Sequence, residues 1–431
     1  MTAQFSATPR AHAPHVCIVT NAPVSQNPRV VKEADALSAE GYKVTVIFAQ
    51  HAPWTIENDR RIVERAAWRG IAVAAWPGGV LPRLRHARLR ARTMICRALA
   101  KVSTAAPIPE LAYSRFLVEQ LREAVAARAD LYIGHNPVSL PVVAWAARKT
   151  GAKYAFDFED FHAGELLPGQ APGPMERLRS ILEARYLAGG SYFTAASPGI
   201  AEEARKAHGI STPTVVLNVF PWRDRDRLQN KPAARPGGLS LYWFSQIVGL
   251  DRGLQDVIRA LGRVRADVTF HIRGDIAPSV REELLALARL DGVESRIAFH
   301  QPVAAEDVLA SCMVHDVGLC LEVPSSINRD VCITNKIFMY MLAGLAVIAS
   351  RTRGQSEVLT AAPEAGFLYP SGDAGALAAI IERLAADKDL VARTRRAALE
   401  AARTRWNWEL ESRVLLQAVD SALSVRVSNA A

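Results

Sequence analysis

Two basic residues lie where a parallel sheet presents phosphate-binding groups. Lys336 follows Asn335 at the start of a predicted helix, and the β-branched run after it at 346–349 suits a buried parallel strand. Backbone N–H groups at a helix start favour phosphate, and Lys336 adds a mobile positive charge. Arg252 precedes Gly253 at the start of another predicted helix, and a guanidinium fork matches the oxygens of a diphosphate. These residues predict the binding of a phosphate or diphosphate group.

A second group of polar residues follows two strands in the first half of the chain. His135 comes directly after a predicted strand at 131–134, and residues 157–162, with the sequence DFEDFH, end the next strand. Ligands of open α/β sheets collect at the carboxyl ends of strands. Four polar groups in six residues exceed what solvation requires, so His135, Glu159 and His162 are candidate site residues. The alternatives are a purely structural histidine and a carboxylate that only caps a strand.

Two series of alternating strands and helices must position these residues. The predicted strands of the first series lie at 16–21, 43–49, 131–134, 153–157 and 192–195. Those of the second series lie at 239–244, 267–273, 296–299, 316–321 and 346–349. Residues 221–238, between the series, are rich in charge, proline and glycine and predict a linker. We therefore expect two Rossmann-like domains that face a cleft.

Composition narrows the classes of protein. At 431 residues, half of them apolar, the chain is too long for one ordinary core and is not disordered. Its formal charge of +9 indicates anionic partners such as nucleotide sugars, phospholipid surfaces or nucleic acid. The five cysteines form no CxxC pair, which favours a reducing cytoplasm and argues against zinc. No signal peptide is expected, and the longest apolar run, at 337–349, is too short to cross a bilayer.

Three segments resemble family 4 glycosyltransferases. Residues 335–350, NKIFMYMLAGLAVIAS, resemble the donor-side signature NK-x-F-E-Y-M-x-A-G-x-P-V-I-A-S. Residues 135–153 resemble the family segment H-[DN]-x-x-x-L-P that ends in G-A-K, and residues 27–46 resemble its first loop and helix. The resemblance spans roughly residues 16–360 and implies the GT-B fold, in which a C-terminal helix crosses back to the first domain.

The resemblance also implies an activity. It indicates a retaining, metal-independent glycosyltransferase of hexosyltransferase type without a cofactor, which moves a sugar from a nucleotide-sugar donor to a sugar or lipid-linked acceptor. The setting it implies is bacterial polysaccharide or glycoconjugate synthesis. The acceptor domain is expected at 1–220, the linker at 221–238, the donor domain at 239–404 and the helix that packs on the first domain at 405–431.

Site residues follow from the same resemblance. The implied catalytic residues are His135, against the donor sugar, and Glu159 and His162, toward the acceptor. The implied donor-binding residues are Arg252, Gly253, Gly274, Asn335, Lys336 and Glu357. Asn27 and Arg29 belong to the acceptor-side loop, and no residue is expected to bind a metal. Plain helix caps at Asn27 and Glu357, and a solvated Arg252, are the alternatives.

The chain departs from the family in one pair of carboxylates. The family has two glutamates spaced E-x7-E that contact the donor, and the aligned residues here are Val331 and Met339. Either Glu322 or Asp330 is expected to substitute if the loop at 322–334 folds inward. An apolar Met339 suggests a different contact to the ribose.

The segment 83–101, RLRHARLRARTMICRALAK, is basic and amphipathic. It contains no acidic residue, and such a helix suits an anionic membrane surface. We expect a cytoplasmic protein, peripheral on the inner membrane face. A solvated helix is the alternative, and an RNA-binding face has little support without interleaved aromatic residues.

Three other functions remain open from the sequence. A GT-B epimerase of a UDP-sugar would share the fold and the nucleotide site. A degenerate, non-catalytic module would account for the two missing glutamates. A nucleic-acid-binding protein fits least, because two α/β halves with polar strand ends do not suit one.

Overall fold

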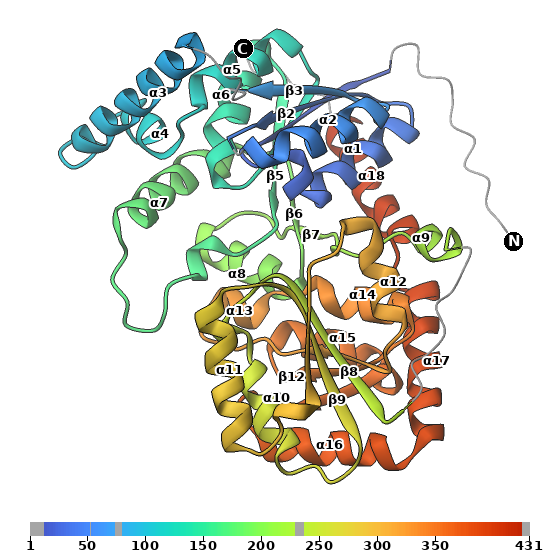
Figure 1. Cartoon of the computed structure of the whole chain (residues 1–431). Helices are drawn as coiled ribbons and strands as arrows, with labels where there is room; N and C mark the ends of the chain where they lie inside the picture. The colour runs from blue at the N-terminus through green and yellow to red at the C-terminus, as the bar shows by residue number, and fades with distance from the viewer. Residues whose placement is uncertain (1–12, 52, 74–79, 229–236, 425–431) are drawn as a thin grey trace, which may run out of the picture.

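The computed structural model describes residues 13–51, 53–73, 80–228 and 237–424. Within these residues the chain forms two parallel β-sheets, each flanked by helices, which Figure 1 shows one above the other. The prediction of two Rossmann-like α/β domains is confirmed. Among the described helices, none combines the length and the apolar character that a membrane crossing needs.

The first sheet has the strand order β3-β2-β1-β4-β5-β6-β7. Its strands are β1 (His15–Thr20), β2 (Lys43–Ala49), β3 (Arg69–Val73), β4 (Leu131–His135), β5 (Lys153–Phe158), β6 (Phe193–Ala195) and β7 (Thr214–Val215). Strands β1 and β4 are buried along their whole length, because helices cover both faces of the sheet. The register pairs Thr20 with His135 and His135 with Asp157, so the three carboxyl ends lie side by side.

The second sheet has the strand order β10-β9-β8-β11-β12-β13. Its strands are β8 (Leu239–Val248), β9 (Val268–Ile276), β10 (Ile297–His300), β11 (Val317–Cys320), β12 (Ala346–Ser350) and β13 (Gly366–Tyr369). In both sheets the strand order reverses beside the first strand, and the crevice at such a switch point is where doubly wound sheets bind ligands.

Helices connect the strands. Those of the first domain are α1 (Pro28–Ala39), α2 (Ile56–Arg65), α3 (Val80–Leu99), α4 (Ile108–Tyr113), α5 (Leu117–Ala127), α6 (Leu140–Thr150), α7 (Pro174–Tyr186) and α8 (Pro198–His208). The others are α9 (Trp222–Asp226), α10 (Leu254–Leu261), α11 (Pro278–Leu290), α12 (Val308–Met313), α13 (Ile327–Val331), α14 (Asn335–Ala343), α15 (Arg353–Ala361), α16 (Ala374–Ala386), α17 (Lys388–Thr404) and α18 (Trp408–Ser424).

The helix and strand predicted from the signature segment are present. Helix α14 begins at Asn335 and ends at Gly344, whose φ of 73° gives the left-handed C-cap that glycine adopts without steric cost. Every residue of α14 from Ile337 onward is buried, and β12 follows after two residues. Burial of the helix from Ile337 onward fixes its partly exposed first turn at the carboxyl ends of β8 and β11.

The last helix returns to the first domain. Figure 1 shows α17 along the second domain and α18 beside α1 of the first. The Tyr42 hydroxyl donates to Asp420, and Lys153 Nζ donates to the Ala422 carbonyl oxygen at 2.6 Å. The backbone N–H of Leu217 donates to Glu411 at 2.9 Å. Helix α18 therefore ties the end of the chain to the first sheet.

Candidate functional site

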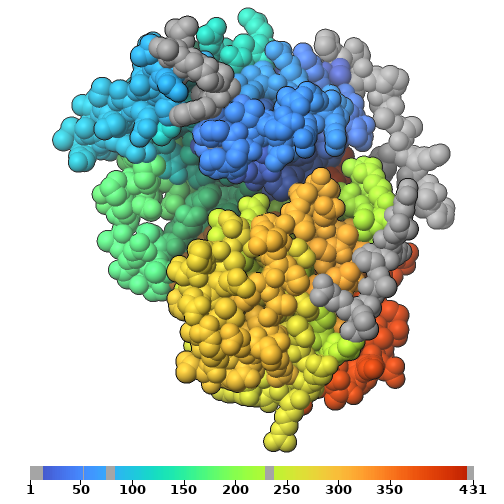
Figure 2. Space-filling model, in the orientation of Figure 1, coloured from blue at the N-terminus to red at the C-terminus, as the bar shows by residue number. Residues whose placement is uncertain are grey.

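A cavity of about 400 Å³ lies between the two domains. Residues that follow β5, β6 and β7 line one wall, and residues that follow β8 and β11 line the other. Figure 2 shows the domains as two lobes, blue to green and yellow to orange, that meet along a cleft. Because the carboxyl ends of both sheets face this cavity, it is the candidate functional site.

Arg252 enters the cavity from the turn after β8. The next residue, Gly253, has a φ of 72°, and a Cβ there would lie 2.4 Å from the Leu321 carbonyl oxygen. Glycine is thus required for this turn to pack against the end of β11. The Nε atom of Arg252 is buried without a hydrogen-bond partner among the described residues, and Asp251 Oδ1 lies 3.6 Å away. Its guanidinium therefore retains hydrogen-bonding capacity for a ligand.

Lys336 lies in the first turn of α14, directly after Asn335, and both line the cavity. Lys336 Nζ donates to Glu322 Oε1 at 3.2 Å and lies 5.6 Å from the centre of the Trp243 ring. Burial opposes ionisation of Glu322, but the Lys336 ammonium outweighs it and lowers the pKa of that carboxyl. The pair is thus charged, and the helix N-terminus beside it adds partial positive charge.

Arg329 is a third cation of this wall, and sequence reasoning missed it. Its Nη2 atom donates to Asp251 Oδ2 at 2.6 Å. Ser326 caps the short helix α13 by accepting from the Arg329 N–H at 3.3 Å. A serine three residues before a basic residue was the available signal, because serine is a common N-cap.

Glu159 faces these cations from the first domain. Its Oε1 atom accepts from Asn27 Nδ2 at 2.8 Å and lies 2.8 Å from His135 Nδ1. Its side chain is 21% exposed, so part of the carboxylate reaches the cavity. Asn27 also caps α1 by accepting from the Val30 N–H at 3.1 Å. Asn27 therefore serves both as helix cap and as support for a cavity residue.

Arg29 forms a buried fork with Asp157. Its Nε and Nη2 atoms each donate to one oxygen of Asp157 at 2.7 Å, and Nη1 donates to the Val216 carbonyl oxygen at 2.7 Å. Burial opposes ionisation of Asp157, but Arg29 outweighs it and lowers the pKa of Asp157 to about 2. The resemblance placed Arg29 in the acceptor-side loop. It borders the cavity, yet its guanidinium is buried because Asp157 binds it.

His135 is fully buried and is not among the residues that line the cavity. It is the last residue of β4, because the strand ends one residue later than the sequence indicated. Its Nε2 atom lies 2.7 Å from Glu33 Oε2, on the side opposite to Glu159. Burial opposes protonation, but Glu33 and Glu159 outweigh it and raise the pKa of His135 to about 10. The ring is thus an imidazolium that donates to both carboxylates.

Stability should therefore depend on pH through His135. A folded-state pKa of about 10, above the ordinary 6.5, stabilises the fold fully below pH 6.5, and the gain is lost as pH rises through about 10. We expect the thermal midpoint of the wild type to fall between pH 6.5 and 10 more steeply than that of His135→Gln. Scanning calorimetry at several pH values measures both curves. Parallel curves would contradict a charged His135.

His135, Asp157 and Glu159 offer ligand atoms within 4.8 Å of one another, as a metal site does. Both ring nitrogens of His135 already face carboxylates, and Arg29 covers both oxygens of Asp157. A cation here would have to displace one of these partners, so the residues present do not fit a metal. The expectation that the protein needs neither metal nor cofactor stays a prediction.

Two further predicted residues lie away from the cavity lining. His162 Nδ1 pairs with Glu165 Oε1 at 2.7 Å, which raises the pKa of His162 although burial opposes it. Gly274 has a φ of 152°, and a Cβ there would lie 2.4 Å from the Ser245 carbonyl oxygen. The close approach of the neighbouring strand β8 therefore requires a glycine at 274, and the donor-binding role that the resemblance implies for Gly274 stays a prediction.

Glu357 and Asp330 contact the α8–α15 region instead of the cavity. Glu357 lies 3.6 Å from Arg353 on the same helix, and its Oε2 atom is buried without a hydrogen-bond partner among the described residues. Asp330 accepts from the Arg353 N–H at 3.0 Å. Arg353 in turn pairs with Glu202 and Glu203 of α8 in the first domain. These residues join the two domains beside the cavity.

The two positions without the expected glutamates are apolar and buried. Val331 is 2% exposed and packs against Gly199 of α8, and Met339 is 7% exposed inside the second domain. Of the two predicted substitutes, Glu322 lines the cavity and Asp330 does not. The cavity thus holds one carboxylate from the second domain among its described residues, supplied by the loop after β11.

Two family models match the chain. The one described as "Glycosyl transferase 4-like domain" matches residues 26–219, and the one described as "Glycosyl transferases group 1" matches residues 240–387. Together they cover most of the chain, one on each sheet. No curated protein matches the chain by sequence.

Solved structures share the fold over nearly the whole chain at low identity. A glycosyltransferase from Rickettsia africae has a TM-score of 0.70 at 14% identity, covering 96% of this chain and 100% of that one. HepE from Anabaena in complex with UDP and glucose has a TM-score of 0.68 at 16% identity, covering 95% and 100%. Sucrose-phosphate synthase from Thermosynechococcus elongatus has a TM-score of 0.67 at 17% identity, covering 95% and 98%. The predicted GT-B fold is confirmed.

Proposed function

The chain belongs to the family 4-like glycosyltransferases of the GT-B fold, and we propose that it transfers a sugar from a nucleotide-sugar donor to a sugar or lipid-linked acceptor. We further propose that transfer retains the anomeric configuration, needs no metal and serves bacterial polysaccharide or glycoconjugate synthesis. One observation carries this proposal. Arg252, Arg329, Lys336 and the start of α14 face Glu159 across one cavity.

The second-domain wall fits a donor diphosphate. Arg252 has a free guanidinium nitrogen, and Lys336 is held by Glu322 beside a helix N-terminus. As the sugar leaves, negative charge develops on the diphosphate, and cations fixed in advance stabilise that charge without reorganisation. Glu322 orients Lys336 and brings a carboxylate to the donor, which compensates in part for the absent glutamates at Val331 and Met339.

The first-domain wall fits the acceptor. The free part of the Glu159 carboxylate accepts a hydrogen bond from the acceptor hydroxyl and so fixes its approach to the sugar. The hydroxyl attacks from the face that the diphosphate leaves, and its proton passes to a phosphate oxygen. His135 acts through Glu159, since it donates to that carboxylate from behind the cavity. His135 is thus a positioning residue, and closure of the domains limits hydrolysis by excluding water.

A proton NMR time course of the protein with UDP-, GDP- and ADP-sugars tests this proposal. A transferase releases nucleoside diphosphate slowly when water accepts the sugar and faster once an acceptor is added. The anomeric coupling constant of the product shows whether the configuration is retained. An inverted anomer would contradict the retaining mechanism. Isomerised nucleotide sugar without release of diphosphate would indicate an epimerase. No change with any sugar nucleotide would indicate a non-catalytic module.

We also propose that α3 contacts an anionic membrane surface. The helix exposes Leu84, Met94, Ile95 and Leu99 among its arginines, at 45% to 67% of their surface. Apolar side chains inserted between lipids, with arginines at the headgroups, describe an interfacial helix. An acceptor that is itself held in a membrane would then meet the first domain directly.

Substitution Ile95→Glu should weaken binding to phosphatidylglycerol vesicles about tenfold. Burial of an isoleucine side chain contributes about 1.5–3 kcal/mol, and the new carboxylate is repelled by the lipid headgroups. Vesicle co-sedimentation measures the partition, with Leu290→Glu on α11 as the matched control because Leu290 is 85% exposed in the second domain. Equal binding of both variants and the wild type would contradict a membrane role for α3.

A further inference from the structure

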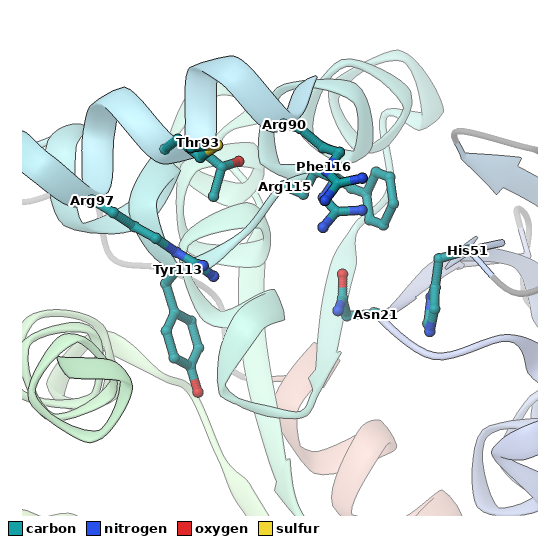
Figure 3. Close-up of a pocket in the computed structure, with 9 residues that line it drawn as sticks. Asn21, His51, Arg90, Thr93, Arg97, Tyr113, Arg115 and Phe116 are labelled. Carbon is teal, nitrogen blue, oxygen red and sulfur yellow. The ribbon is translucent and has the colours of Figure 1, made fainter. Parts of the chain in front are cut away.

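A second cavity, of about 450 Å³, lies in the first domain beneath α3. Three arginines line it: Arg90 and Arg97 from α3, and Arg115 from the segment before α5. Asn21, which follows β1, and His51, which follows β2, form its floor (Figure 3). No acidic residue is among the described residues that line this cavity, which we call the arginine pocket.

The three arginines lack carboxylate partners within the described residues. Arg92 of the same helix, by contrast, pairs with Glu119 at 3.1 Å. Arg97 Nε donates to the Ala112 carbonyl oxygen at 3.1 Å, which positions its guanidinium without neutralising it. Burial and the nearby Arg90 and Arg97 lower the pKa of Arg115, which shows mutual repulsion among the three cations. An anion that enters the pocket would remove this repulsion.

The arginine pocket also offers a neutral polar group. The Asn21 side-chain oxygen is buried and has no hydrogen-bond partner among the described residues. Tyr113 lines the same cavity through its ring, and its hydroxyl points away from the three arginines (Figure 3). A ligand with a phosphate for the arginines and a hydroxyl group that donates to Asn21 would satisfy both. A phosphorylated sugar has this combination.

The arginine pocket and the cleft share one edge of the first sheet. Asn21 follows Thr20, the last residue of β1, which pairs with His135 at the end of β4. The Thr20 hydroxyl donates to the Asn136 side-chain oxygen at 3.3 Å, which links the two strand ends. Both cavities therefore lie at the carboxyl end of the first sheet.

We propose that the arginine pocket binds a phosphate or diphosphate group of the acceptor. This inference rests on the proposed transferase function. The group belongs either to a soluble phosphorylated acceptor or to a lipid headgroup, and both present the same anion to Arg90, Arg97 and Arg115. A phosphate fixed there would orient the rest of the acceptor toward the cleft.

Calorimetric titration with inorganic pyrophosphate tests the proposal, in the presence of whichever nucleoside diphosphate saturates the cleft. Loss of one charged hydrogen-bond pair should raise the pyrophosphate dissociation constant of Arg115→Gln about tenfold or more. The same variant should keep the wild-type affinity for the nucleotide. Arg88→Gln is the matched control, because Arg88 is exposed on α3 and does not line the pocket.

Each outcome bears on one claim. Unchanged pyrophosphate affinity in Arg115→Gln, or an equal loss in Arg88→Gln, would overturn the arginine pocket as an anion site. A third outcome is a wild type that binds no nucleotide but binds pyrophosphate, with that binding lost in Arg115→Gln. This result would overturn the proposed transferase function and the acceptor role, and it would leave the arginine pocket as an anion site. Co-sedimentation with phosphatidylcholine vesicles that contain phosphatidic acid separates the sources. If Arg115→Gln loses vesicle binding together with pyrophosphate binding, the anion is a lipid headgroup. If the variant sediments with the vesicles as the wild type does, the anion belongs to a soluble acceptor.

Discussion

Replacement of Arg252 by alanine is expected to lower kcat/KM for sugar transfer about 100- to 1,000-fold. Removal of one fixed donor from a site where negative charge develops costs about 2.7–4 kcal/mol of transition-state stabilisation. The Nε atom of Arg252 is buried without a hydrogen-bond partner among the described residues, and Asp251 Oδ1 lies 3.6 Å away, so this guanidinium retains hydrogen-bonding capacity for the diphosphate. Steady-state assays of diphosphate release with the donor identified by NMR measure the change.

Two variants show whether the effect comes from the position and shape of the guanidinium. Arg252→Lys keeps the charge but loses the fork, and should retain more activity than the alanine variant. Arg393→Ala removes an arginine of α17 that is 58% exposed and lies 3.7 Å from Asp387, in a pair open to solvent. This variant should leave kcat/KM unchanged. An Arg252→Ala enzyme as active as Arg393→Ala would remove Arg252 from the donor site.

Replacement of Arg29 by methionine is expected to reduce the free energy of unfolding by about 3–5 kcal/mol. Removal of one partner from a buried pair leaves an uncompensated charge in the interior. Here Arg29 is the cation that donates to both oxygens of Asp157, and without it Asp157 must share His135 with Glu159, because His135 Nδ1 lies 3.4 Å from Asp157 and 2.8 Å from Glu159. Urea denaturation followed by circular dichroism measures the difference at neutral pH.

An exposed ion pair is the control for this effect. Arg403 and Glu400 form an i,i+3 pair on α17 in which both side chains are more than half exposed, so Arg403→Met should leave the free energy of unfolding nearly unchanged. The double variant Arg29→Met/Asp157→Asn should lose less stability than the two single losses add up to, because the pair is removed together. Equal stability of Arg29→Met and Arg403→Met would show that the Arg29–Asp157 pair does not stabilise the fold.

The alternation of strands and helices was predictable where burial is continuous. Strand β1 contains a continuous apolar run, and Gly344 separates the apolar runs of α14 and β12. The structure confirms all three elements. Strands β3 and β13 were not predicted. Both lie at or near a sheet edge, their residues are largely half-buried, and neither shows a strong apolar run.

The site was predictable in part. Arg252, Asn335, Lys336 and Glu159 each follow a strand or begin a helix, and the structure brings all four to one cavity, although their roles in catalysis stay predictions. The burial of His135 depends on Glu33, which is 102 residues away in the chain. Arg329 pairs with Asp251 across 78 residues from a helix of five residues. These two pairings arise from packing. The local signal at Ser326 indicates where α13 begins but not that Arg329 pairs with Asp251.

Titration calorimetry of the wild type and Arg252→Ala with UDP, GDP, ADP and CMP tests the central claim most directly. The claim is that the cavity between the domains binds the diphosphate of a nucleotide-sugar donor. We predict micromolar affinity of the wild type for one of these nucleotides and at least tenfold weaker binding by the variant. The absence of binding by all four, or equal binding by both proteins, would contradict the claim.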